Sequence, residues 1–107
     1  EYHDKKIAYT SQLAHIVSNA YVKSETADGY AGFTGGSFQD MTRIAGVDEK
    51  VWTRLYFLNR QNIAEELRGL ICRLQEYESA LVSGNEEELA RLLREGRLRK
   101  EKLDTEK

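Results

Sequence analysis

Small and apolar residues recur every three or four positions along most of this chain, which is the spacing of one face of an α-helix. Over residues 4–22 the recurring positions are Ile7, Ser11, Ala14, Val17 and Tyr21. Residues 23–32 are polar and contain glycine, which predicts a loop. The first part of the chain is therefore predicted to be one long helix followed by a connection.

The longest periodic run lies in residues 63–81. Its members follow spacings of four and three in alternation: Ile63, Leu67, Leu70, Leu74, Tyr77 and Leu81. This alternation is the seam of a heptad repeat. Charged residues flank the seam, which is the usual composition of a solvated helix face. The run predicts one long helix, and it leaves open whether the seam packs within the chain or against a second copy.

Capping residues predict two shorter helices between these runs. Ser37 is placed to cap a short helix that reaches Ala45, and Asp40 completes the capping arrangement. Gly46 is expected to end this helix, and Asp48 to cap the next one. That next helix carries four apolar or aromatic residues on one side: Val51, Trp52, Leu55 and Tyr56.

The chain ends in one further predicted helix. Residues 83–85 form a turn, and Asn85 with Glu88 three positions later is a capping signature. Acids cluster near the start of this helix and bases near its end, an order that the helix dipole favours. We expect four leucines to face inward: Leu89, Leu92, Leu93 and Leu103.

The stretch of residues 33–45 departs from the helical pattern. A Gly-Gly pair lies between two phenylalanines, and Arg43 follows. Adjacent glycines permit positive φ and close backbone approach. A planar guanidinium in apolar surroundings requires an anionic partner. That partner is either the carboxylate of a ligand or an internal ion pair with Asp40 or Asp48.

His15 is a second candidate, on the first predicted helix among small and apolar residues. The simpler interpretation is a packed histidine whose ring bonds to a neighbouring carbonyl, because one titratable group does not establish a site. The alternative is that His15 converges with Arg43 and Trp52. Spacing alone does not decide between the two.

Composition limits the class of protein. A chain of 107 residues is long enough for one domain with a core. The formal charge of −2, from 16 basic and 18 acidic residues, gives no nucleic-acid footprint. Cys72 is the single cysteine, so neither a disulfide nor a metal site is expected, and the cytoplasm is the expected compartment. No apolar run reaches the ~20 residues of a membrane span.

Several motifs together resemble the C-terminal helical domain of prephenate dehydrogenases. They are His3 with Asp4, the segment at residues 11–15, the segment at residues 35–45, Trp52, and Asn59 with Asn62. Their order and spacing match that family over nearly the whole chain. The most specific part is the glycine pair leading to Thr-Arg-Ile-Ala, with Trp52 nine residues after Arg43.

The resemblance implies an all-α fold for residues 1–107, similar to the C-terminal domain of 6-phosphogluconate dehydrogenase, with one long heptad-bearing helix. It also implies an enzyme of tyrosine biosynthesis that oxidatively decarboxylates prephenate to 4-hydroxyphenylpyruvate and reduces NAD or NADP. In that family an N-terminal Rossmann domain binds the cofactor and supplies the principal catalytic histidine. The chain starts at Glu1 and enters helical sequence at once, so we expect a part of a longer protein that is inactive alone, without catalytic residues of its own.

The resemblance assigns binding roles to five residues of this chain. Arg43 matches the arginine that holds a substrate carboxylate, and His15 closes the family's Ser-x-Leu-x-His motif at the cleft. Gln12, in the same motif, stands where family members often have histidine. Gly36 and Trp52 match positions near the active site of the neighbouring subunit, which implies a homodimer with composite sites.

Other functions remain open on the sequence. An arogenate dehydrogenase shares the same motifs. A helical chorismate mutase also dimerises and binds a dianion, but it needs several converging cations, and here Arg43 alone lies in a plausible pocket. A non-catalytic helical dimerisation module would account for the heptad but not for residues 33–45. The expected partners are a prephenate-like dicarboxylate and a second copy of the chain, with no nucleic acid, membrane or metal.

Overall fold

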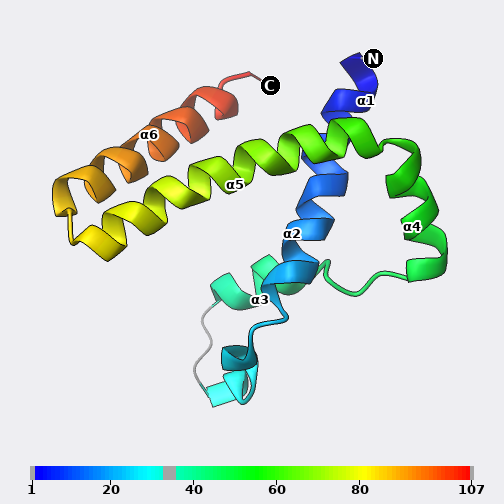
Figure 1. Ribbon diagram of the computed structural model, residues 1–107, viewed down its shortest axis with the longest axis horizontal. Helices are drawn as coiled ribbons and strands as arrows, with labels where there is room; N and C mark the ends of the chain where they lie inside the picture. The colour runs from blue at the N-terminus through cyan, green and yellow to red at the C-terminus, as the bar shows by residue number, and fades with distance from the viewer. Residues whose placement is uncertain (1, 33–35, 107) are drawn as a thin grey trace. The chain divides into compact units, whose positions relative to one another are not determined.

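The structure, a computed structural model, describes residues 2–32 and 36–106 (Figure 1). Regular structure in these ranges is entirely helical, with no strand, so the predicted all-α fold is confirmed. The chain divides into two compact units, Glu1–Leu67 and Arg68–Lys107. Each unit is held by contacts of its own.

The first unit begins with a continuous helical run, coloured blue in Figure 1, that corresponds to the first predicted helix. It consists of α1 (Tyr2–Ile7), a π-helical segment (Ala8–Gln12) and α2 (Leu13–Tyr21). The sequence did not predict the π-helical segment. Such segments are rare and occur frequently at functional sites, because the wider turn redirects the side chains that follow.

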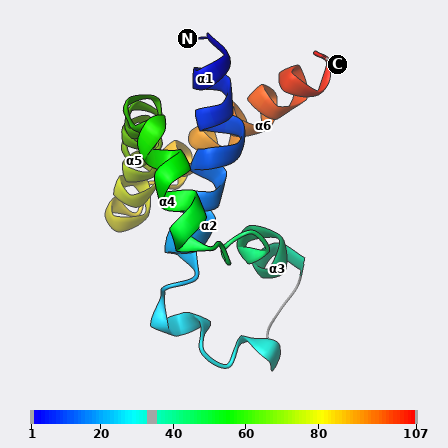
Figure 2. The same cartoon turned by 90° about the vertical axis from the view of Figure 1, so that its right-hand side faces the viewer.

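The segment of residues 22–32, after α2 and before α3 (Gly36–Thr42), has little regular structure, as Figure 2 shows. It contains two short 3₁₀ turns, Glu25–Ala27 and Tyr30–Gly32, where the sequence predicted a plain loop. Residues 33–35, which hold the first half of the predicted glycine turn, lie outside the described residues.

The predicted ends of α3 were wrong. The helix starts at Gly36, so Ser37 lies inside its first turn and does not cap it, and the helix stops at Thr42 instead of reaching Ala45. The Nδ2 of Asn19, on α2, donates a hydrogen bond to the carbonyl oxygen of Ala45 at 2.9 Å. This hydrogen bond links α2 to the predicted end of α3. The two residues are 26 positions apart, so the local sequence pattern does not predict it.

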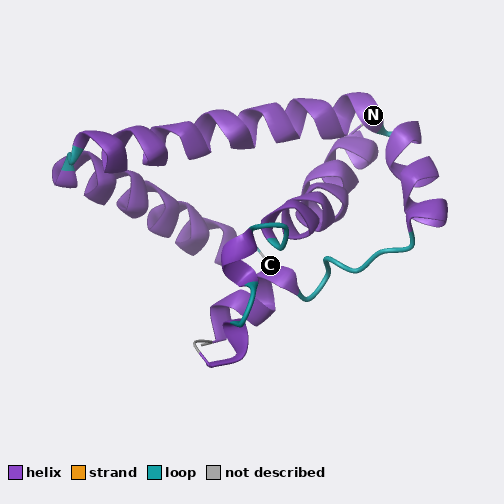
Figure 3. Cartoon of the chain, turned by 60° about the horizontal axis from the view of Figure 1, so that its bottom comes forward, coloured by secondary structure: helices purple, strands orange, loops and turns teal. Residues whose placement is uncertain are grey.

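Two further helices complete the first unit and begin the second. The connection drawn as a loop in Figure 3 leads into α4 (Glu49–Leu58), and α5 (Arg60–Ser83) follows. Asp48 caps α4 as predicted, accepting a backbone N–H at 2.9 Å. Of the predicted apolar side of α4, Trp52 and Tyr56 are half-buried. The other two members are exposed: Val51 and Leu55.

The second unit is built from the C-terminal part of α5 and α6 (Glu86–Asp104), which are joined by a tight turn. Gly84 adopts a positive φ of 69°, the left-handed conformation that commonly ends a helix. The backbone N–H groups of Gly84 and Asn85 then donate to the carbonyls of Leu81 and Ala80. Asn85 caps α6 by accepting from the Glu88 backbone at 3.0 Å, as the sequence predicted.

The long heptad-bearing helix is confirmed as α5, but its seam is covered unevenly. Ile63 is buried, whereas Leu67, Leu70 and Tyr77 are half-buried. Leu74 and Leu81 are 54% and 64% exposed. One chain therefore covers only part of the apolar seam.

Helix α6 packs against α5 through a narrow stripe of side chains. Leu92 is buried, and its carbonyl oxygen accepts a hydrogen bond from the Tyr77 hydroxyl at 3.4 Å. The prediction that Leu93 and Leu103 also face inward was wrong, because these side chains are 57% and 40% exposed. Leu93 lies ~100° around the helix from Leu92, outside the stripe.

Candidate functional site

An aromatic row joins the first helical run to α4. The rings of His15 and Trp52 are stacked, with centroids 5.6 Å apart and planes inclined by 19°. Trp52 in turn contacts Tyr56, with centroids 6.0 Å apart. Two of the three residues considered for convergence therefore meet within one chain.

The hydrogen bond of His15 determines which ring nitrogen is open. Its Nδ1 lies 2.8 Å from the carbonyl oxygen of Ser11. Because a carbonyl only accepts, Nδ1 must carry the proton, as the simpler interpretation of this histidine expected. In the neutral ring, Nε2 is then an acceptor, and in the cationic ring it becomes a donor for an anion.

Side-chain amides extend the site from the aromatic row toward α5. Asn59, between α4 and α5, donates through Nδ2 to the Gln12 side-chain oxygen at 2.7 Å and to the backbone oxygen of Asp4 at 3.0 Å. Its own side-chain oxygen accepts from Asn62 Nδ2 at 2.8 Å. Gln12, one of the predicted binding residues, is thus held beside His15 on the same helical run.

Tyr56 ends the aromatic row and also lines an apolar groove between α4 and the first turns of α5. The groove is formed by Thr53, Tyr56, Phe57, Arg60, Ile63, Ala64 and Leu67. The Tyr56 hydroxyl is buried and bonds to none of the described residues. Burial raises the pKa of this hydroxyl, because the phenolate form is costly to desolvate.

The structure places Arg43 on the surface, with its side chain 74% exposed. Its Nη1 lies 3.7 Å from Asp40 Oδ1, so one of the internal ion pairs that the sequence left open does form. Such an exposed pair contributes about 0–1 kcal/mol. No hydrogen bond or ring contact among the described residues joins Arg43 to His15, although the Asn19–Ala45 hydrogen bond ties the following segment to α2, one turn after His15.

Gly36 is exposed at the first position of α3. A Cβ built on this residue would have only one described neighbour within reach, an Asp40 carboxylate oxygen at 4.0 Å. The described part of the chain therefore imposes no steric need for glycine here. The contribution of Gly36 to a neighbouring subunit's site stays a prediction.

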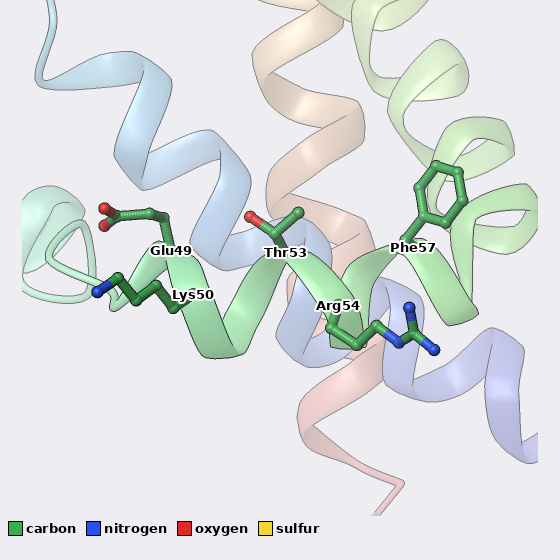
Figure 4. A pocket seen from close by; sticks show the side chains of 5 residues that line it. All are labelled: Glu49, Lys50, Thr53, Arg54 and Phe57. Atoms are coloured by element: carbon green, nitrogen blue, oxygen red, sulfur yellow. The ribbon is translucent and has the colours of Figure 1, made fainter.

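A hollow on α4 involves none of the predicted site residues. Figure 4 shows its five side chains, which all project from this single helix: Glu49, Lys50, Thr53, Arg54 and Phe57. A ligand there would have a wall on one side only. We therefore place the candidate site at the aromatic row and its amides.

Neither a metal site nor a membrane-spanning helix is found in the part of the chain that the structure describes. No group of three histidine, cysteine, aspartate or glutamate side chains is placed to hold a metal ion within that part. Of the helices described, none combines the length and the apolar content needed to cross a membrane.

Sequence reasoning missed Asn59 and Tyr56 as site residues. Asn59 was noted within the motif pattern, and its place between two helical runs is a weak signal for a capping amide. Its partner Gln12 lies 47 positions earlier, which no local pattern reveals.

Comparison with known proteins finds relatives of one kind. The family described as "Prephenate dehydrogenase, dimerization domain" matches residues 1–95. The cyclohexadienyl dehydrogenase of Zymomonas mobilis subsp. mobilis is 29% identical over 91 residues, covering 78% of this chain and 30% of that protein. The crystal structure of Synechocystis arogenate dehydrogenase superposes with a TM-score of 0.80 at 22% identity, covering 94% of this chain and 39% of that one. The chain thus spans less than half the length of either relative, and the superposition shows the fold.

Proposed function

This chain belongs to the prephenate dehydrogenase family through the dimerization domain that matches its residues 1–95, and from that premise we propose that it forms one wall of a dicarboxylate-binding site in a dehydrogenase. The proposed reaction is oxidative decarboxylation of prephenate to 4-hydroxyphenylpyruvate, with arogenate as the alternative substrate. The observation that carries the proposal is the stack of His15 on Trp52, with ring centroids 5.6 Å apart.

Three side chains supply the chemistry for binding an anionic substrate. His15 offers Nε2, since Nδ1 is occupied by the Ser11 carbonyl: in the neutral ring it accepts from a substrate hydroxyl, and in the cationic ring it donates to a carboxylate. Gln12 offers its side-chain nitrogen, since its oxygen is occupied by Asn59. Arg43 is exposed, and its weak pair with Asp40 can be exchanged for a bidentate, charge-assisted bond to a substrate carboxylate.

The stack also bears on how sites are shared between subunits. The resemblance assigned Trp52 to the neighbouring subunit's site and His15 to the cleft. Because their rings are in contact within one chain, we propose that both serve the same site. In a homodimer this site would then be completed by Gly36 from the other copy, where the absence of a side chain permits close approach.

The proposed cofactor is NAD or NADP, which would accept the hydride. Dinucleotide sites of the Rossmann type need a strand followed by a glycine-rich turn, and the described residues of this chain include no strand. This domain is therefore unsuited to hold the dinucleotide, and we propose that a separate domain binds it and supplies the catalytic histidine. The task of this chain is to orient the substrate.

The test is a steady-state assay of the full-length protein with prephenate or arogenate and either cofactor. Replacing Arg43 by alanine should raise KM at least about tenfold with a smaller change in kcat, which corresponds to about 1.4 kcal/mol of lost binding. Arg54→Ala is the matched control, because Arg54 is also an exposed arginine, lies on α4 in the hollow of Figure 4, and is not among the proposed site residues. Absence of turnover, or equal KM values for the two variants, would refute the proposal.

A further inference from the structure

Three side-chain amides and one backbone carbonyl form a continuous hydrogen-bonded chain at the site. Asn59 Nδ2 lies 3.0 Å from the Asp4 carbonyl oxygen and 2.7 Å from Gln12 Oε1. Asn62 Nδ2 lies 2.8 Å from Asn59 Oδ1. This hydrogen-bonded network connects α1, the π-helical segment and the start of α5.

The Asp4 backbone carbonyl determines which group donates and which accepts in every hydrogen bond of this network. A carbonyl oxygen only accepts, so the group of Asn59 that faces Asp4 must be its NH₂. The same NH₂ faces Gln12, which must therefore present its oxygen to Asn59. The remaining oxygen of Asn59 accepts from Asn62. Turning any one of these amides over would set donor against donor or acceptor against acceptor.

This network determines which end of the Gln12 amide remains available. Gln12 is the last residue of the π-helical segment and lies three positions before His15. Its oxygen is occupied, and its Nε2 donates to no acceptor among the described residues. We propose that Asn59 is a positioning residue that presents the amide nitrogen of Gln12, and not its oxygen, to an anionic oxygen of the substrate. This inference rests on the proposed function, because it takes Gln12 to face the substrate.

Asn59 is itself well anchored for such a role. Its backbone N–H donates to the Tyr56 carbonyl at 3.0 Å, and its carbonyl accepts from Ile63 at 3.1 Å. Tyr56 is half-buried in the aromatic row, and Ile63 is buried. An amide held in this way does not have to be ordered when the substrate arrives, which is the advantage of a pre-organised contact.

Asn59→Asp is the decisive variant, because it keeps the shape of the side chain and removes its donor. A carboxylate only accepts, so Gln12 would turn its NH₂ toward position 59 and leave its oxygen facing the substrate. In the full-length enzyme we expect KM for the active substrate to rise about tenfold or more, with kcat changed by less than about threefold. Asn59→Ala, which frees Gln12 without inverting it, should raise KM by a smaller factor.

A second measurement separates positioning from general damage. In a Gln12→Ala background, Asn59→Asp should leave KM unchanged, because the group it acts through is gone. Asn85→Ala is the matched control: it also removes a hydrogen-bonding asparagine, the cap of α6, and should leave KM at the wild-type value.

The outcomes distinguish this inference from the proposed function. If the wild-type enzyme oxidises neither prephenate nor arogenate, the proposed function fails, and the inference fails with it. If the wild type is active but Asn59→Asp has wild-type KM, the inference alone is overturned. It is likewise overturned if Asn59→Asp raises KM by the same factor with and without Gln12.

Discussion

Tyr56 carries a hydroxyl that is buried without a partner among the described residues. Such a group costs about 1–3 kcal/mol relative to one that is hydrogen-bonded. Tyr56→Phe keeps the ring against Trp52 and removes the hydroxyl, so we expect the free energy of unfolding of this chain to rise by up to about 1 kcal/mol. Urea denaturation followed by circular dichroism measures the change.

The matched control for Tyr56 is Tyr77→Phe. The Tyr77 hydroxyl donates to the Leu92 carbonyl at 3.4 Å, so its removal should lower stability by about 0.5–1.5 kcal/mol. A loss of stability in Tyr56→Phe as well would show that the Tyr56 hydroxyl has a partner in solution. The sequence predicted that Tyr56 lies on the apolar side of its helix. Whether its hydroxyl finds a hydrogen-bond partner depends on packing between helices, which the sequence does not reveal.

Helix α6 carries several ion pairs between side chains three or four positions apart. Arg91 Nη2 and Nε donate to the two carboxylate oxygens of Glu88 at 2.6 and 2.9 Å. This hydrogen bonding lowers the pKa of Glu88 below its ordinary value. A carboxylate with a lowered folded-state pKa stabilises the fold above its unfolded pKa, and the contribution disappears as pH falls through the folded value. We therefore expect α6 to lose stability as pH falls below the ordinary glutamate pKa of about 4.3 and toward the lower folded-state value.

Thermal unfolding followed by circular dichroism at several pH values tests this expectation. Glu88→Gln should remove part of the acid-induced decrease in Tm, because the amide does not titrate. Glu86→Gln changes the same charge in the same first turn, at a residue that makes no ion pair with any described residue, and should retain the decrease. Equal pH profiles for the two variants would contradict a special role for the Glu88–Arg91 pair.

The elements that the sequence predicted correctly are those set by neighbouring residues. Asp48 and Asn85 cap helices through backbone groups two and three positions away, so their role is visible in the sequence. The end of α3 was predicted wrongly: after Thr42 the chain makes a turn in which the Ala45 N–H bonds to the Thr42 carbonyl, and the Ala45 carbonyl bonds to Asn19, 26 positions earlier. The π-helical segment, Ala8–Gln12, has no composition that separates it from an α-helix.

At the scale of the whole molecule, periodicity predicted the all-α class and the long helix α5, because both follow from the spacing of apolar residues. The candidate site was predicted only in part. The motif pattern indicated His15 and Trp52, but their contact and the bond between Gln12 and Asn59 join distant parts of the chain. Only the fold brings such residues together.

The exposed part of the heptad seam leads to the last prediction. Leu74 and Leu81 are 54% and 64% exposed in the single chain. Fully burying one exposed leucine side chain contributes about 1.5–3 kcal/mol. Because both side chains are already partly covered, a second copy that buried the rest would gain about 2–3.5 kcal/mol. This chain belongs to a family whose matching domain is described as a dimerization domain, and we expect the seam to be part of a homodimer interface.

The double substitution Leu74→Glu and Leu81→Glu should therefore weaken self-association by at least about a hundredfold. Analytical ultracentrifugation over a range of concentrations measures the dissociation constant. Gln75→Glu is the control: it introduces the same side chain next to Leu74 but ~100° around α5, away from the seam, at an exposed position. If the double variant associates as tightly as the control, the seam is not part of the interface, because two carboxylates buried at a dry interface would cause a large loss of affinity.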